Sequence, residues 1–123
     1  MNGQYANALA ALYLACGQDV ACIAESAVGI TRLEMAKAGA LYASVTLPNL
    51  VLGTVGGGTR LPSQSACLEL MGLSGAERAP ALAEVTAALC LAGELSLVGA
   101  ICAGDFARAH RELGRQPTSE GTP

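Results

Sequence analysis

Residues 80–104 read PALAEVTAALCLAGELSLVGAICAG, and this nearly unbroken apolar run decides how the rest of the chain can pack. It is long enough to cross a bilayer, which takes about 20 apolar residues. Glu84 and Glu94 interrupt the run, however, and an ionised carboxylate near the centre of a membrane helix is costly. We therefore expect a helix from about Pro80 to about Ala103 that is buried in protein, and no membrane segment in this chain. A buried Glu94 would need a hydrogen-bonding partner, and we interpret it as structural.

The composition points to an aliphatic core that is only partly covered. Hydrophobic residues make up 52% of the 123 residues, charged residues 14% and aromatic residues 3%. A chain of this length forms one modest core and usually one domain. Apolar surface left exposed by so little charge is normally covered by a partner or by further parts of the same protein. The composition therefore suggests a piece of something larger.

Charge and cysteine usage argue against two classes of protein. Seven Lys and Arg stand against ten Asp and Glu, with no Trp and one Phe, so nucleic-acid binding is not expected. The five cysteines include no C-x-x-C pair, which favours reduced, buried thiols and a cytoplasmic location over a disulfide framework. Residues 1–5 lack the basic region of a signal peptide. We also expect no metal site.

The N-terminal half predicts a helix followed by a hairpin. Residues 5–16 are rich in Ala and Leu, and Gly17 stands where a C-terminal cap belongs. Thr, Tyr and β-branched residues between 28 and 52 favour two strands, joined by a turn at 37–40.

The C-terminal half predicts further helices. Pro62 suits the first turn of a short helix over residues 63–71. A helical turn or two runs through residues 110–113, beyond the long apolar helix, and the polar tail 116–123 is expected to be disordered. This order of elements predicts an α+β class, with apolar helices packed on a β-hairpin, rather than a doubly wound α/β fold.

Two features near the chain's turns could carry chemistry. Asp19 follows an apolar helix and a small turn, so its carboxylate could project into a cleft or could simply cap the next segment. Residues 53–59, GTVGGGT, hold three consecutive glycines that permit positive φ angles and close approach of a backbone or a ligand. The loop matches neither G-x-G-x-x-G nor the P-loop, so a phosphate site and a plain turn both remain open.

His110 is the only histidine, and it lies among Arg108, Arg111 and Arg115. Histidine titrates near neutrality and suits proton donation, although a lone histidine is often a surface residue. The arginines could contact an anionic ligand or solvate one face of a helix.

Taken together, the motifs resemble a known family. The chain is similar, in sequence and in order, to the hydroxymethylglutaryl-coenzyme A (HMG-CoA) reductases at Asn2, Asn7, 15–19 (ACGQD), 42–48 (YASVTLP), 53–59, 61–67 (LPSQSAC), 91–97 (LAGELSL) and 103–110. The resemblance covers residues 2 to about 115. The intact glycine triplet and the Leu-Pro-x-Gln run are typical of the class I enzymes, which use NADPH.

The resemblance implies an activity and two catalytic roles. Members of the family reduce the thioester HMG-CoA to mevalonate in two hydride transfers. Asp19 matches the catalytic aspartate, which lies in a carboxylate–lysine network beside the thioester carbonyl, where an ammonium stabilises the developing oxyanion. His110 matches the histidine that protonates the departing coenzyme A thiolate.

The resemblance also implies where ligands bind. The positions that match NADPH contacts are Val55, Gly56, Gly57, Gln64 and Arg115. The positions that match the substrate site are Asn7, close to the catalytic lysine, and the apolar wall of Leu97, Ala100 and Ile101. NADPH, HMG-CoA and coenzyme A are the expected ligands. Because active sites of the family form between subunits, we expect a homo-oligomer assembled through the missing domains.

Several positions depart from the family pattern. Gln4 stands where a histidine contacts coenzyme A, and Phe106 and Arg111 replace aliphatic or hydrophobic residues around His110. The catalytic glutamate, the catalytic lysine and the small cofactor-binding domain are expected upstream, since the only lysine, Lys37, falls in the hairpin.

Residues 1–115 are thus expected to form the C-terminal portion of the large, substrate-binding domain. Alone, the chain should be inactive, because losing one strong oxyanion donor costs about 3–4 kcal/mol. Two alternatives stay open: a non-catalytic module that pairs with a full-length reductase or binds nucleotide, and a non-functional remnant.

Expressed alone, the chain is expected to form oligomers or aggregates, because its long apolar helix would expose surface that other domains cover. Size-exclusion chromatography with light scattering measures this directly. A monodisperse monomer that melts cooperatively would contradict the expectation.

Overall fold

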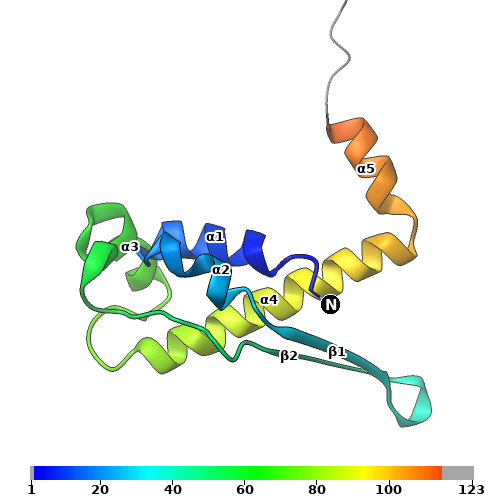
Figure 1. Ribbon diagram of the computed structural model, residues 1–123, viewed down its shortest axis with the longest axis horizontal. Helices are drawn as coiled ribbons and strands as arrows, with labels where there is room; N and C mark the ends of the chain where they lie inside the picture. The colour runs from blue at the N-terminus through cyan, green and yellow to red at the C-terminus, as the bar shows by residue number, and fades with distance from the viewer. Residues whose placement is uncertain (1, 115–123) are drawn as a thin grey trace, which may run out of the picture.

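The computed structural model describes residues 2–114, and its longest element is helix α4 (Ala79–Cys102) (Figure 1). Helix α1 (Tyr5–Cys16) packs on α4. An antiparallel hairpin of β1 (Ile30–Met35) and β2 (Leu41–Thr46) packs on α4 through β2. Helices packed on a hairpin confirm the predicted α+β class. The predicted tail, residues 116–123, lies outside the described residues.

The shorter elements connect these parts. They are η1 (Val20–Cys22), α2 (Ile23–Ser26), η2 (Lys37–Gly39), η3 (Gly57–Arg60), α3 (Pro62–Leu70) and α5 (Asp105–Leu113). Helix α5 is longer than the one or two turns predicted. The left-handed backbone of Gly104 (φ +73°) ends the long helix, and the Asp105 carboxylate pairs with Arg108 at 2.6 Å across the first turn of the next one. The helical turns over residues 20–26 were not predicted, because they are too short to show a period.

Helix α4 buries one narrow face rather than its whole circumference. Leu82, Thr86, Cys90 and Glu94 recur at every fourth position and form the buried row. Other apolar side chains of α4 remain more than a third exposed, namely Val85, Leu89, Leu95 and Ile101. The expectation of a buried helix therefore holds for this face alone. Within residues 2–114, α4 is the one helix whose length and composition alone would allow it to cross a membrane.

The hydrophobic core consists of two clusters arranged along α1. The first holds Tyr5, Ala8, Leu9, Tyr13 and Cys90. The second, at the end of α1, holds Cys16, Leu68, Leu73 and Leu82, and so joins α1 to α3 and α4. Burial raises the pKa of the Tyr5 and Tyr13 phenols and of the Cys16 and Cys90 thiols, as expected for groups inside a core.

Glu94 ties α4 to the start of α1 and to β1. Its Oε1 accepts hydrogen bonds from the backbone N–H groups of Gly3 and Gln4, both at 2.7 Å, and its Oε2 accepts one from the Thr31 hydroxyl at 3.2 Å. The residue is only 3% exposed. The two N–H groups open α1, where the helix dipole is positive and the Gln4 side chain provides no cap. The interpretation of Glu94 as structural is confirmed.

Replacing Glu94 by Gln is expected to lower the free energy of unfolding by about 1–3 kcal/mol, because a neutral amide oxygen accepts the Gly3 and Gln4 N–H groups more weakly than the charged carboxylate does. Glu84→Gln, on an exposed side of the same helix, is the matched control and should change it by less than about 0.5 kcal/mol. Urea unfolding followed by circular dichroism at one protein concentration measures both variants. Equal midpoints would show that the Glu94 carboxylate provides no specific stabilisation.

Candidate functional site

The turn that ends α1 lies directly against the glycine loop, residues 53–59. Gly17 adopts the left-handed conformation (φ +67°), and a Cβ added to it would lie 2.3 Å from the carbonyl carbon of Gly58. A Cβ added to Gly58 would lie 3.1 Å from the Gly17 carbonyl oxygen. The backbones can meet this closely only because Gly17 lacks a side chain, and a side chain on Gly58 would make the contact tight. The predicted close approach of another backbone to the glycine triplet is confirmed.

Hydrogen bonds of Thr54 and Thr59 fix the rest of the loop, and the backbone between these two residues faces open space. The Thr59 hydroxyl donates to the Gly56 carbonyl at 2.6 Å, and the Thr54 hydroxyl donates to the Gly75 carbonyl at 2.7 Å. Gly56 and Gly57 have φ angles of +81° and +52°. A Cβ added to Gly56 would meet no atom within 4 Å, so the loop faces open space at this point.

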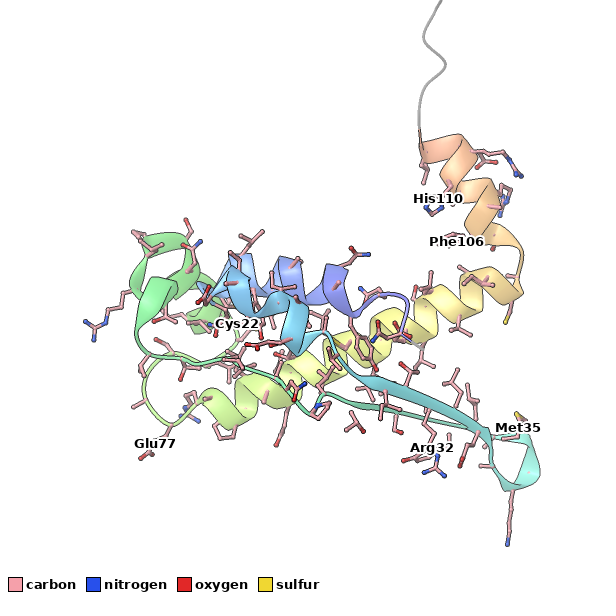
Figure 2. The ribbon with its side chains drawn as sticks, in the orientation of Figure 1. Cys22, Arg32, Met35, Glu77, Phe106 and His110 are labelled. Atoms are coloured by element: carbon pink, nitrogen blue, oxygen red, sulfur yellow. The ribbon has the colours of Figure 1, made fainter. Side chains whose placement is uncertain are left out.

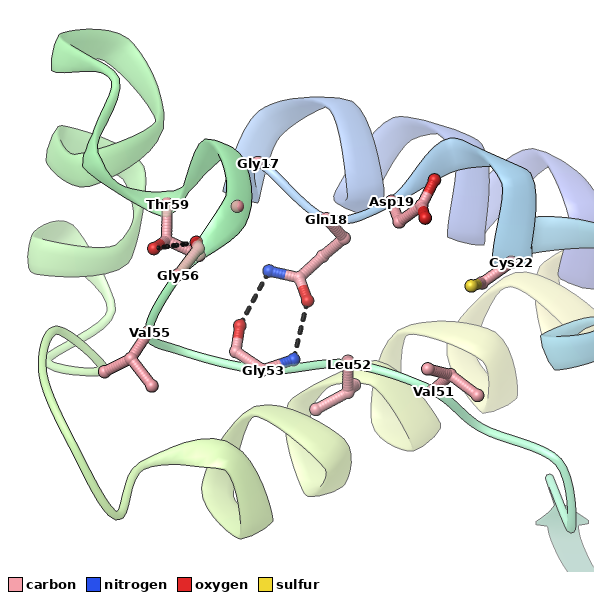
Figure 3. A pocket seen from close by; sticks show the side chains of 11 residues that line it. Gly17, Gln18, Asp19, Cys22, Val51, Leu52, Gly53, Val55, Gly56 and Thr59 are labelled. Carbon is pink, nitrogen blue, oxygen red and sulfur yellow. Dashed lines mark hydrogen bonds between the residues drawn. The ribbon is translucent and has the colours of Figure 1, made fainter.

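Gln18 pairs with the backbone at the start of this loop, as Figure 3 shows. Its Nε2 donates to the Gly53 carbonyl at 2.8 Å, and its Oε1 accepts from the Gly53 N–H at 2.7 Å. The same Nε2 donates to the Cys16 carbonyl at 3.0 Å. No role for Gln18 was predicted. Its place between Gly17 and Asp19 in the ACGQD motif was the available signal, but a pairing across 35 positions is not visible in a sequence.

Asp19 fulfils both of the roles that were left open. Its Oδ1 accepts from the Ala21 N–H at 2.9 Å and so caps the short helix η1. The residue is exposed, and it also lines two hollows beside the turn. In the first hollow it is accompanied by Cys22. Partial burial, a side-chain hydrogen bond with Glu25 and the charge of Asp19 raise the pKa of the Cys22 thiol, which is therefore protonated at neutral pH.

The two hollows flank the turn of residues 17–19. The first, of about 160 Å³, is also lined by the loop residues Val55 and Gly56 (Figure 3) and by Gly57. The second, of about 430 Å³, reaches from Gly57 to Gln64, whose Nε2 donates to the Leu14 carbonyl at 3.2 Å. Among the described residues that line them, Asp19 carries the one charged side chain.

The predicted site residues divide into groups. One group gathers at the C-terminal end of α1, and its members are Asp19, Val55, Gly56, Gly57 and Gln64. A second group lies toward the opposite end, and its members are Asn7, Leu97, Ala100 and Ile101. There, the Leu97 side chain packs over the backbone of Gly3. The twelve residues of α1 separate the groups by roughly 18 Å of helix.

His110 belongs to neither group. It lies on α5, which leads away from the body of the molecule (Figure 2). Its Nδ1 is 2.9 Å from the Phe106 carbonyl oxygen, and the two rings have centroids 4.3 Å apart. The histidine is exposed and lines a separate hollow of about 260 Å³. Arg115 lies outside the described residues. Within residues 2–114 no cluster of three His, Cys, Asp or Glu side chains could hold a metal ion.

Known proteins resemble the chain over almost its whole length. A family model described as hydroxymethylglutaryl-coenzyme A reductase matches residues 1–115. The 3-hydroxy-3-methylglutaryl-coenzyme A reductases of Methanocaldococcus jannaschii and Methanothermobacter thermautotrophicus are each 53% identical to it over 114 residues, which cover 93% of this chain and 28% of theirs. Reductase 1 of Solanum tuberosum is 47% identical over 121 residues, which cover 93% of this chain and 20% of that protein.

These matches define an oxidoreductase family. The chain belongs to the hydroxymethylglutaryl-coenzyme A reductases, which confirms the resemblance. It spans 28% of the length of the first two relatives.

Replacing Gly17 by Ala is expected to destabilise the chain more than replacing Gly39, which has a similar backbone (φ +78°) in the hairpin turn. Gly39→Ala should cost about 1–2 kcal/mol, the penalty for a left-handed alanine, because no atom lies within 4 Å of the new methyl. Gly17→Ala adds a collision with the Gly58 backbone. Urea midpoints compare the two variants, and equal losses would mean that the contact between the two glycines is not needed for stability.

Proposed function

We propose that this chain is the C-terminal part of the large domain of an NADPH-dependent reductase that converts HMG-CoA to mevalonate. Membership of the family and the meeting of Asp19 with the glycine loop carry this proposal. The backbone contact between Gly17 and Gly58 holds the residue proposed to act on the thioester beside the loop proposed to contact the nicotinamide nucleotide.

The reaction determines what the two proposed catalytic residues do. Reduction of a thioester to a primary alcohol releases the coenzyme A thiol and consumes two hydrides, supplied by NADPH when bound, and two protons. The exposed Asp19 carboxylate can orient an ammonium from another part of the enzyme beside the thioester carbonyl. His110 can donate a proton to the departing thiolate. Because α5 leads away from Asp19, the proposal requires that α5 moves or that the two residues serve different subunits.

The residues around the glycine loop fit part of a dinucleotide. The hollow of about 430 Å³ is within the size range of small-molecule sites, and the open backbone at Gly56 permits close approach of a phosphate. Since Asp19 is the one charge among the described lining residues, the phosphate charge has to be balanced by cations from elsewhere. This supports the expectation that a further domain completes the cofactor site.

The separation of the site residues supports a homo-oligomer. Asp19 and the apolar wall of Leu97, Ala100 and Ile101 lie toward opposite ends of α1. One subunit can therefore contribute different groups to two active sites, as the family's arrangement between subunits requires. The exposed apolar side chains of α4 would then be covered by protein rather than by lipid, and the buried, hydrogen-bonded Glu94 favours the same conclusion. All five cysteines are free thiols, which supports a cytoplasmic location.

A chimera tests the function. In it, this chain replaces the matching C-terminal segment of the Methanocaldococcus reductase. We expect the chimera to oxidise NADPH when HMG-CoA is added, measured by the absorbance of the reduced nicotinamide, and the chain alone to be inactive. In the chimera, Asp19→Asn should lower kcat by about 10²–10³-fold and His110→Gln by about 10²–10⁴-fold, while Glu84→Gln serves as the control.

A folded chimera without activity would contradict the proposal, as would full activity in either catalytic-site variant. An inactive chain that co-elutes with an intact reductase and alters its rate would instead favour the non-catalytic module.

A further inference from the structure

Gln18 connects Asp19, the proposed catalytic residue, to the glycine loop, which is proposed to contact NADPH. Asp19 follows it in the chain, and the Gln18 side chain pairs with Gly53, the first residue of the loop. Resting on the proposed function, we propose that Gln18 is a positioning residue that fixes the hydride donor relative to Asp19 through its paired hydrogen bonds to Gly53. It touches neither substrate nor reacting atoms in this role.

Almost all of the hydrogen-bonding capacity of the Gln18 amide is satisfied. Both hydrogens of Nε2 have acceptors, the carbonyls of Gly53 and Cys16, and Oε1 accepts the Gly53 N–H. The bonds of 2.7 and 2.8 Å to one residue imitate the pairing of neighbouring strands. A side chain must both donate and accept to do this, and only an amide of this length does so without a charge.

The loop is thereby held at both of its ends. Gln18 fixes Gly53 at the start, and Gly17 contacts Gly58 near the end, while the open turn of the loop lies between them. The two anchoring residues, Gly17 and Gln18, directly precede Asp19 in the chain. Loss of either anchor would therefore free the loop to move relative to the Asp19 carboxylate. A misplacement of about 1 Å between reacting groups can cost on the order of 10²-fold in rate.

Two substitutions separate the effect of the Gln18 hydrogen bonds from the effect of the size of its side chain. Gln18→Met keeps the length and removes every hydrogen bond. Gln18→Glu keeps the acceptor for the Gly53 N–H but turns a second oxygen toward the carbonyls of Gly53 and Cys16. Protonation of that carboxyl at lower pH restores one donor, so the Glu variant should recover as pH falls and the Met variant should not.

The test measures kcat, both KM values and the primary isotope effect in the active chimera, with NADPH deuterated at the transferred hydrogen. Both variants should lose kcat by about 10–10²-fold, with a larger isotope effect and a KM for HMG-CoA that stays within about twofold. The Glu variant should regain at least part of this loss at low pH. Each rate is divided by that of the unsubstituted chimera at the same pH, because Asp19, Cys22 and Tyr13 also line the two hollows.

The possible failures are distinguishable. An inactive parent chimera overturns the proposed function, and this inference with it. An active parent whose Gln18 variants keep their kcat, or lose it with an unchanged isotope effect and no recovery of the Glu variant at low pH, overturns the inference alone. In that case Gln18 stabilises the fold without positioning the hydride donor.

Discussion

The buried carboxylate of Glu94 is the constraint on which the arrangement of α1, β1 and α4 depends. Helix α4 is apolar on almost every side, so hydrophobic burial by itself leaves its rotation about the helix axis poorly defined. A carboxylate taken out of water must be hydrogen-bonded, and only one orientation of α4 brings Glu94 to the N–H groups of Gly3 and Gln4 and to the Thr31 hydroxyl. The same bonds cap α1 and anchor the first strand, so one side chain orients three elements.

A second set of contacts, at the C-terminal end of α1, joins that helix to the glycine loop at the candidate site. The Gly17 and Gly58 backbones are in contact there. The Gln18 side-chain amide makes two hydrogen bonds to the Gly53 backbone, as a neighbouring strand would. The packing of α1 on α4 and α3 connects these contacts to those of Glu94. Asp19 and the glycine loop are consequently held close together, while the apolar wall around Leu97 lies toward the junction at Glu94. This separation is what a site completed by a second subunit would need.

The exposed apolar surface agrees with a chain that spans 28% of its relatives. One row of α4 is buried, and Met35 in the hairpin is 74% exposed (Figure 2). Helix α5 carries His110 away from the body. Among the described residues that line the two hollows beside the glycine loop, Asp19 carries the one charged side chain.

The sequence by itself determined the elements with local signals. Gly17 and Pro62 mark the boundaries of helices α1 and α3, the turn at residues 37–40 places the hairpin, and the ordered motifs identify the family, because caps, turns and motifs are properties of neighbouring residues. Only the tertiary structure decided which face of α4 is buried, what Gln18 binds and how the site residues divide. The physical reason is that Gln18 meets a partner 35 positions away and Glu94 meets partners up to 91 positions away, and no pattern of spacing encodes such a contact.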